Sequence, residues 1–142
     1  MAAEQGGRNR EEELYTLGYM QQVYQNQYNS LVSEINRNVQ YLNELSGLKK
    51  TLESSGMADN KDVLVNLGGG AYMNSRIKKF DSVLVEIGAG LVIEKRIDEA
   101  KLFVDSRIEK ATQMFNSLVK NRNDLREAIL DVAHRIDALD RK

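Results

Sequence analysis

The feature that most constrains this chain is a pair of long segments in which apolar residues recur every three or four positions. In the first segment, heptad positions a and d are mostly apolar or tyrosine. These positions are occupied by Leu14, Leu17, Gln21, Tyr24, Tyr28, Leu31, Ile35, Asn38, Leu42, Leu45, Lys49 and Leu52. A seam sustained over so many heptads is typical of a coiled coil and not of an ordinary amphipathic helix. Residues 14–55 are therefore predicted to form one long helix.

The second such segment covers residues 98–142, and its heptad pattern is cleaner. Its a and d positions are occupied by Val104, Ile108, Ala111, Phe115, Leu118, Arg122, Leu125, Ile129, Val132, Ile136 and Leu139. Asp98 and Glu99 place negative charge in the first turn, where the helix dipole favours it. Because neither helix can bury its apolar stripe alone, we expect the two to pair as an antiparallel coiled-coil hairpin within one chain.

The segment between the helices, residues 62–97, repeats itself. Val63-Leu64-Val65 with Gly68 and Gly70 recurs as Val83-Leu84-Val85 with Gly88 and Gly90. A β-branched strand, a glycine turn and a second strand are the signature of a β-hairpin. Two tandem hairpins are therefore predicted at the base of the coiled coil.

Two isolated hairpins bury too little apolar surface to be stable alone, and their edges lack strand partners. We therefore expect them to join strands of other subunits in an intersubunit β-barrel. The residues predicted to mediate this oligomerisation are Val63, Val65, Leu67, Gly68, Gly70, Val83, Val85, Ile87, Gly88, Gly90 and Ile93. The predicted fold is thus mainly α with a small β part, preceded by a disordered or frayed polar segment at residues 1–13.

Composition narrows the classes of function. A net charge of -1 gives no basic footprint for a nucleic-acid partner. The chain has no cysteine, which excludes disulfides and thiol catalysis. It also has neither a signal-peptide core nor an apolar run long enough to span a membrane. We expect a soluble, cytoplasmic protein without a membrane partner.

No catalytic or metal-binding constellation is recognisable. Gly68-Gly69-Gly70 is not followed by the Gly-Lys-Ser/Thr of a phosphate-binding loop. The single histidine, His134, falls on the outer face of its helix with no second histidine or cysteine to share a metal. The sequence therefore predicts no enzyme activity, no cofactor and no metal site.

The order of a helix, a Val-Leu-Val-x-Leu-Gly-x-Gly hairpin, a second such hairpin and a helix resembles prefoldin subunits. The doubled hairpin resembles the alpha class of that family, and the resemblance runs from about Leu14 onward. Many members carry proline where this chain has Asn66. The resemblance implies a hetero-hexamer of two alpha and four beta-type subunits, which holds unfolded proteins at its coil tips without ATP and delivers them to a group II chaperonin.

The coil tip comprises the start of the first helix and the end of the second. Tyr15, Tyr19, Met20 and Val23 lie off the seam, and flexible methionine with amphipathic tyrosine suits a surface that accepts many sequences. The residues predicted to bind clients are Leu14, Tyr15, Leu17, Tyr19, Met20, Val23, Tyr24, Ile129, Val132, Ile136 and Leu139. Those of the second helix are seam residues first and are expected to reach a client only if the helix ends separate.

Two further hypotheses follow from the sequence. Arg122 and Asn38 interrupt the apolar seam, which suggests a polar layer, with Glu34 reaching Arg122, that fixes the register of the two helices. As an alternative to chaperone function, the chain could be a structural or scaffold coiled-coil protein that docks one defined partner.

Overall fold

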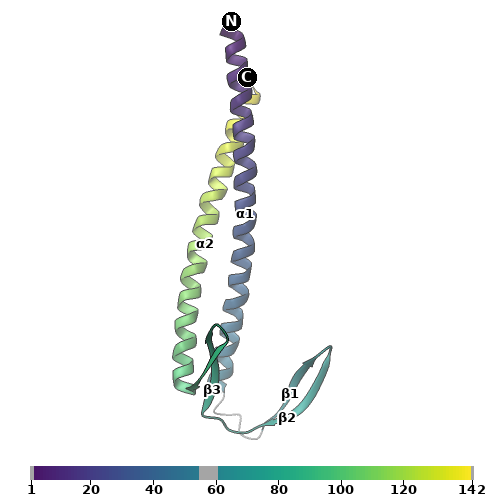
Figure 1. Cartoon of the computed structure of the whole chain (residues 1–142), viewed down its shortest axis with the longest axis vertical. Coiled ribbons are helices and arrows are strands. Elements are labelled where there is room, and N and C mark those ends of the chain that lie inside the picture. Colours follow the sequence, from purple (N-terminus) through teal and green to yellow (C-terminus); the bar gives the residue numbers. More distant parts are fainter. Residues whose placement is uncertain (1, 55–60, 142) are drawn as a thin grey trace. The chain divides into compact units, whose positions relative to one another are not determined.

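A computed structural model describes residues 2–54 and 61–141 of the chain. The elements are, in order, α1 (Ala2–Ser54), β1 (Lys61–Gly68), β2 (Ala71–Ile77), β3 (Ser82–Gly88), β4 (Leu91–Arg96) and α2 (Ile97–Asp140) (Figure 1). This order confirms the predicted fold class, two long helices with two small hairpins between them. The chain divides into two compact units: unit 1 contains residues 1–40 and 112–142, and unit 2 contains residues 41–111.

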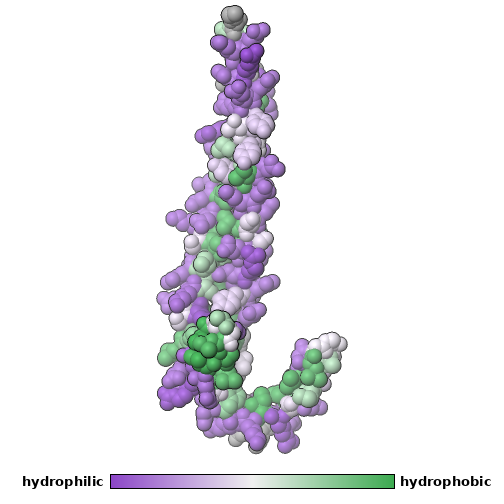
Figure 2. Space-filling view, viewed as in Figure 1, coloured by the Kyte–Doolittle hydropathy of each residue, from purple (hydrophilic) through white to green (hydrophobic). Residues whose placement is uncertain are grey.

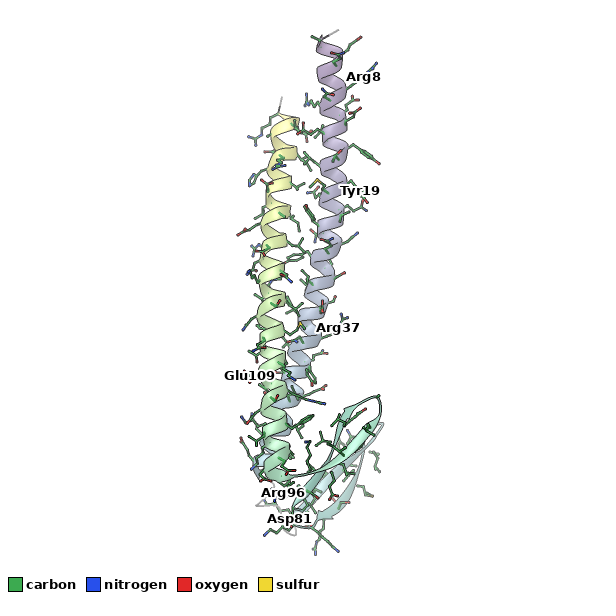
Figure 3. The ribbon with its side chains drawn as sticks, turned by 60° about the vertical axis from the view of Figure 1, so that its left-hand side comes forward. Arg8, Tyr19, Arg37, Asp81, Arg96 and Glu109 are labelled. Atoms are coloured by element: carbon green, nitrogen blue, oxygen red, sulfur yellow. The ribbon has the colours of Figure 1, made fainter. Side chains whose placement is uncertain are left out.

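In unit 1, α1 and α2 lie side by side and bury the predicted seam (Figures 1 and 3). The buried apolar side chains of this unit are Leu17, Ile35, Leu118 and Val132. All four occupy a or d positions of the heptad pattern. The seam prediction is therefore confirmed for this part of the coiled coil.

In unit 2, residues of the seam form part of a small core. Leu52, Ala100 and Val104 form this core, in which Val104 is only 1% exposed. The partly buried side chains packed against it are Val83, Val85, Ile97 and Ile108. Because Val83 and Val85 belong to β3, this core joins the second hairpin to the helices.

The two hairpins are separate two-stranded antiparallel sheets, β1–β2 and β3–β4. Val65 lies opposite Met73 in the first, and Val85 lies opposite Ile93 in the second. Both pairings shift register just before the turn, between Asn66 and Gly68 and between Glu86 and Gly88. The sequence repeat is thus also a structural repeat, down to the position of the β-bulge.

Each turn has two residues with positive φ, the geometry that matches the twist of hairpin strands. These are Gly69 and Gly70 in the first turn, with φ of 59° and 81°, and Ala89 and Gly90 in the second, with φ of 50° and 74°. For a residue with a Cβ this conformation costs about 1–2 kcal/mol. A glycine at the second turn position avoids this cost, whereas Ala89 adopts positive φ at the first position of the second turn.

The helices begin earlier than the sequence predicts. In the structure, residues 2–13 continue α1 where the sequence predicts a disordered or frayed segment, and Met1 and Ser55 lie outside the described residues. Once a long helix is nucleated, each added residue costs little, so α1 continues through this polar segment although it contains Gly6 and Gly7. α2 begins at Ile97, whose backbone N–H donates to the carbonyl of Asp81 at 3.0 Å.

The predicted polar layer is wrong in one respect. Within residues 2–54 and 61–141, no ion pair joins Glu34 to Arg122; instead Nη2 of Arg122 donates to Oδ1 of Asn123 at 3.4 Å. A guanidinium at the edge of the seam can turn toward solvent and therefore does not need the carboxylate. Oδ1 of Asn38 is buried without a hydrogen-bond partner, and a register role for Asn38 stays a prediction.

Candidate interaction surfaces

The β3–β4 hairpin packs on the helices of unit 2 through one of its two faces. Val83, Val85, Ile93 and Lys95 share this face, because Val83 pairs with Lys95 and Val85 with Ile93. All four side chains are half-buried. We call this the docked face.

The opposite face of the β3–β4 hairpin carries Leu84 and Val92. Their exposed fractions are 74% and 51%. We call this the open face, and Figure 2 shows hydrophobic atoms gathered over this hairpin. An exposed apolar surface of this kind is typical of a protein–protein contact.

Polar contacts add to the apolar packing of the docked face. Nη2 of Arg107 donates a hydrogen bond to the backbone carbonyl of Glu86 at 3.0 Å. The guanidinium carbon of Arg107 lies 4.3 Å from the ring centroid of Phe103, and Nζ of Lys95 lies 5.1 Å from the same centroid. Two cations from different elements thus meet one aromatic ring, an arrangement that stabilises by about 0.5–1 kcal/mol per pair at exposed sites.

A mainly apolar pocket lies where this hairpin meets the helices. It is lined by Leu45, Leu48, Leu52, Val83, Leu84, Val85, Glu86, Ala100, Phe103, Val104 and Arg107. Its wall therefore includes residues of α1, β3 and α2. Leu84 also lines this pocket, although its side chain is 74% exposed.

The β1–β2 hairpin exposes apolar side chains on both faces. Leu64 and Tyr72 are 67% and 60% exposed, and on the other face Val65 and Met73 are 39% and 47% exposed. Leu67, at the bulge, is 61% exposed. A hairpin with two apolar faces needs a cover on each, so this one is a candidate surface for assembly.

Two polar side-chain interactions lie within the β1–β2 hairpin itself. Nε of Arg76 lies 2.9 Å from Oδ1 of Asp62 across the two strands. Oδ1 of Asn66 accepts a hydrogen bond from the backbone N–H of Gly68 at 2.8 Å. Asn66 thus holds the bulge at the position where proline is common in the resembling family. Nowhere in the described ranges does a hydrogen bond or ion pair join β1 or β2 to a helix.

Among the predicted oligomerisation residues, the structure separates those that are exposed from those that are covered. Val65, Leu67 and Ile87 are exposed, whereas Val83 and Val85 pack on the chain's own core. Other exposed apolar side chains of the hairpins, which the prediction did not include, are Leu64, Tyr72, Met73, Leu84, Leu91 and Val92. The uninterrupted Val-Leu-Val runs indicated apolar side chains on both faces, because such runs are typical of strands covered on both faces.

In unit 1, two tyrosines form an exposed aromatic surface near the start of α1. Tyr15 and Tyr19 are 80% and 64% exposed, and they lie one turn apart on one side of the helix. A shallow depression is lined by Leu14, Tyr15, Gly18, Tyr19 and Gln22. Figure 3 shows Tyr19 on the side of α1 away from α2, and Arg8 beyond the end of α2.

The other predicted client-binding residues are less accessible. Leu17 and Val132 are 5% and 3% exposed, so they are buried between the helices. The remaining seven are half-buried: Leu14, Met20, Val23, Tyr24, Ile129, Ile136 and Leu139. Tyr15 and Tyr19 are therefore the two that a client could reach without any separation of the helices.

Two other kinds of site find no support in the part of the chain that the structure describes. Across residues 2–54 and 61–141, no three histidine, cysteine or acidic side chains are grouped so that they could hold a metal ion. In the same ranges, neither helix has a stretch apolar enough to span a membrane.

Comparison with known proteins agrees with the architecture. The family model "Prefoldin subunit" matches residues 24–142. The chain is 30% identical over 103 residues to prefoldin subunit alpha of Thermococcus onnurineus, covering 71% of this chain and 70% of that protein. It is 26% identical over 136 residues to prefoldin subunit alpha of Pyrococcus horikoshii, covering 92% and 89%.

A solved structure has a similar fold. The cryo-electron microscopy structure of filamentous PFD from Methanocaldococcus jannaschii matches with a TM-score of 0.56 and 28% sequence identity. The match covers 83% of this chain and 93% of the other. The fold of this chain is thus similar to that of a protein described as filamentous.

Proposed function

This chain belongs to the prefoldin family of chaperones, as an alpha-type subunit, and from that premise we propose that it is part of an ATP-independent holdase. The holdase captures unfolded polypeptides at the coil tips and delivers them to a group II chaperonin in the cytosol. Its partners are other prefoldin subunits, and the proposed complex contains two alpha and four beta-type subunits.

The exposed pair Tyr15 and Tyr19 is the observation that carries the client-binding part of this proposal. Unfolded clients present scattered apolar side chains, and tyrosine offers both an apolar ring and a hydroxyl that hydrogen-bonds. Burying one such side chain contributes only about 1.5–3 kcal/mol. Several tips must therefore act together, which a multi-subunit complex achieves through effective concentration.

The exposed hairpins support the assembly part. Leu64, Leu67 and Tyr72 of the first hairpin and Leu84 of the second each have more than half of their surface in solvent. A chain in isolation would leave this apolar surface in contact with water. Neighbouring subunits that cover it would join several coil tips in one particle.

The proposal is tested by adding a chemically unfolded client to this chain together with a beta-type subunit, in the absence of nucleotide, and following aggregation by light scattering. The complex is expected to suppress aggregation of several unrelated clients. A truncated chain that lacks residues 1–24 and 131–142 should still assemble but should no longer suppress aggregation.

Other outcomes would contradict parts of this proposal. Binding of a single folded partner, with no suppression for any client, would favour the scaffold alternative. Suppression that persists in the truncated complex would contradict the tip as the client site. Delivery is tested by adding a group II chaperonin to the loaded complex and measuring whether a labelled client moves to the chaperonin fraction.

A further inference from the structure

We propose that Arg107 and Phe103 are positioning residues that hold the β3–β4 hairpin on the chain's own helices, so that its open face is left for a neighbouring subunit. The docked face with Val83 and Val85 is held against the chain's own helices, and the open face with Leu84 and Val92 is left for the neighbour. The identity of the neighbour rests on the proposed function, whereas the choice of face rests on the contacts within unit 2.

The pattern of polar and apolar residues already favours the docked face. Side chains alternate between the faces of a strand, so turning the hairpin over would exchange one set for the other. The docked face would lose Val83, Val85 and Ile93. It would gain Leu84 and Val92 together with the polar side chains of Ser82, Glu86, Glu94 and Arg96. Specific contacts with α2 add to this preference.

Two contacts join the docked hairpin to α2. Lys95 lies on the docked face, and its Nζ is 5.1 Å from the centroid of the Phe103 ring. Nη2 of Arg107 donates to the carbonyl of Glu86 at 3.0 Å, while its guanidinium stacks on the Phe103 ring at 4.3 Å within α2. Turning the hairpin over would carry Lys95 away from Phe103, so that contact is specific to the observed orientation.

The repeat shows that the Lys95 contact belongs to the second hairpin alone. Where β4 has Lys95, the corresponding residue of β2 is Ser75. Serine carries no charge, so β2 offers no cation at this position. The two hairpins therefore differ in how they are held, although their strands are alike.

Because the chain has no cysteine, one introduced thiol reports the exposure of one position. The full-length variants Leu84→Cys and Val85→Cys place that thiol on the open and the docked face. We expect a maleimide to label Leu84→Cys about tenfold faster or more, since labelling depends on access to the thiol. Equal rates in the chain alone would overturn the docking.

The positioning role is tested by combining Val85→Cys with changes on α2. Arg107→Met removes the guanidinium but keeps most of the stem, and Phe103→Leu removes the ring; each should raise the labelling rate of Val85→Cys toward that of Leu84→Cys. Phe103→Tyr keeps the ring and should leave the rate low. Arg126→Met, an exposed arginine elsewhere on α2, is the matched control and should also leave it low. If Arg107→Met and Phe103→Leu behave like the control, these residues do not position the hairpin.

The choice of face is then tested in the complex. Mixing with a beta-type subunit should protect Leu84→Cys from the maleimide and leave the slow labelling of Val85→Cys unchanged. A complex that forms but leaves Leu84→Cys fully reactive would overturn the assignment of the open face. Failure to form any complex would contradict the proposed function, and with it the beta-type subunit as the neighbour. The labelling rates of the two cysteine variants in the chain alone would still show whether the hairpin is docked on the helices.

Discussion

Nζ of Lys49 lies 2.7 Å from Oδ1 of Asp105, and this ion pair joins α1 to α2 in unit 2. Lys49 occupies an a position of the heptad pattern, where an apolar residue is expected. Its side chain is 41% exposed and that of Asp105 is 47% exposed. The aliphatic stem of Lys49 can therefore cover the seam while its ammonium group reaches the carboxylate at the edge.

This pair makes stability depend on pH in the alkaline range. The hydrogen bond and the charge of Asp105 raise the pKa of Lys49 above its ordinary value. A raised pKa means that the stabilisation is fully present below the pKa of the unfolded chain, about 10.4, and is lost as pH rises through the folded pKa. We expect the urea midpoint of the wild type to approach that of Lys49→Met above this pH. Because the pair is half exposed, the effect is small, and a difference between the two proteins that does not change with pH would contradict it.

The core of unit 2 should be sensitive to the loss of volume at Leu52. This side chain is 3% exposed and packs with Ala100 and Val104. Leu52→Ala should lower the free energy of unfolding by about 2–5 kcal/mol, because a buried leucine leaves a cavity. Leu102→Ala, at a position 71% exposed on α2, should change it by no more than about 0.5 kcal/mol. Urea denaturation followed by circular dichroism measures both, and similar losses in the two variants would show that Leu52 is not a core residue.

Glycine-to-alanine substitutions in a hairpin turn and in a helix should have opposite effects on stability. Gly90 has a φ of 74°, so Gly90→Ala should destabilise by about 1–2 kcal/mol. Gly47 lies within α1, and a Cβ added there would meet nothing within 4 Å, so Gly47→Ala should stabilise by about 0.5–1 kcal/mol. Thermal unfolding of the two variants shows whether each substitution stabilises or destabilises the protein. A Gly90→Ala variant as stable as the wild type would mean that the turn does not need positive φ.

Client capture should depend on the exposed tyrosines of α1. The double variant Tyr15→Ser and Tyr19→Ser removes two rings that are 80% and 64% exposed and should weaken suppression of client aggregation several-fold. Tyr41→Ser is the matched control, because Tyr41 is 40% exposed on α1 but belongs to unit 2. Both proteins should assemble normally, as judged by size-exclusion chromatography. Equal suppression of aggregation by the double variant and the control would show that these tyrosines do not belong to the client site.

Much of the fold could be predicted because it follows from periodicity. The heptad pattern places Leu17, Ile35, Leu118 and Val132 at a and d positions, and the structure buries all four. The repeat of Val-Leu-Val and glycine likewise predicts two hairpins with the same turn. These features depend on residues close together in sequence, whose local geometry leaves few alternatives.

The sequence could not show that the chain's own helices cover one face of the second hairpin. Val83 and Val85 are predicted to join other subunits, but in the structure they pack on the core of unit 2. Ala100 is fully buried although it lies off the a and d positions, because β3 packs over that turn. Tertiary contacts of this kind leave no periodic pattern in the sequence, so they could not be predicted from it.

Recruitment of other prefoldin subunits by the exposed hairpins is the central claim, on which the proposed function depends. Native mass spectrometry of the chain alone, and after mixing with a beta-type subunit, tests it most directly. We expect a hetero-hexamer that contains two copies of this chain and four of its partner. A chain that remains a monomer in the mixture, at concentrations where the partner is folded, would contradict the claim.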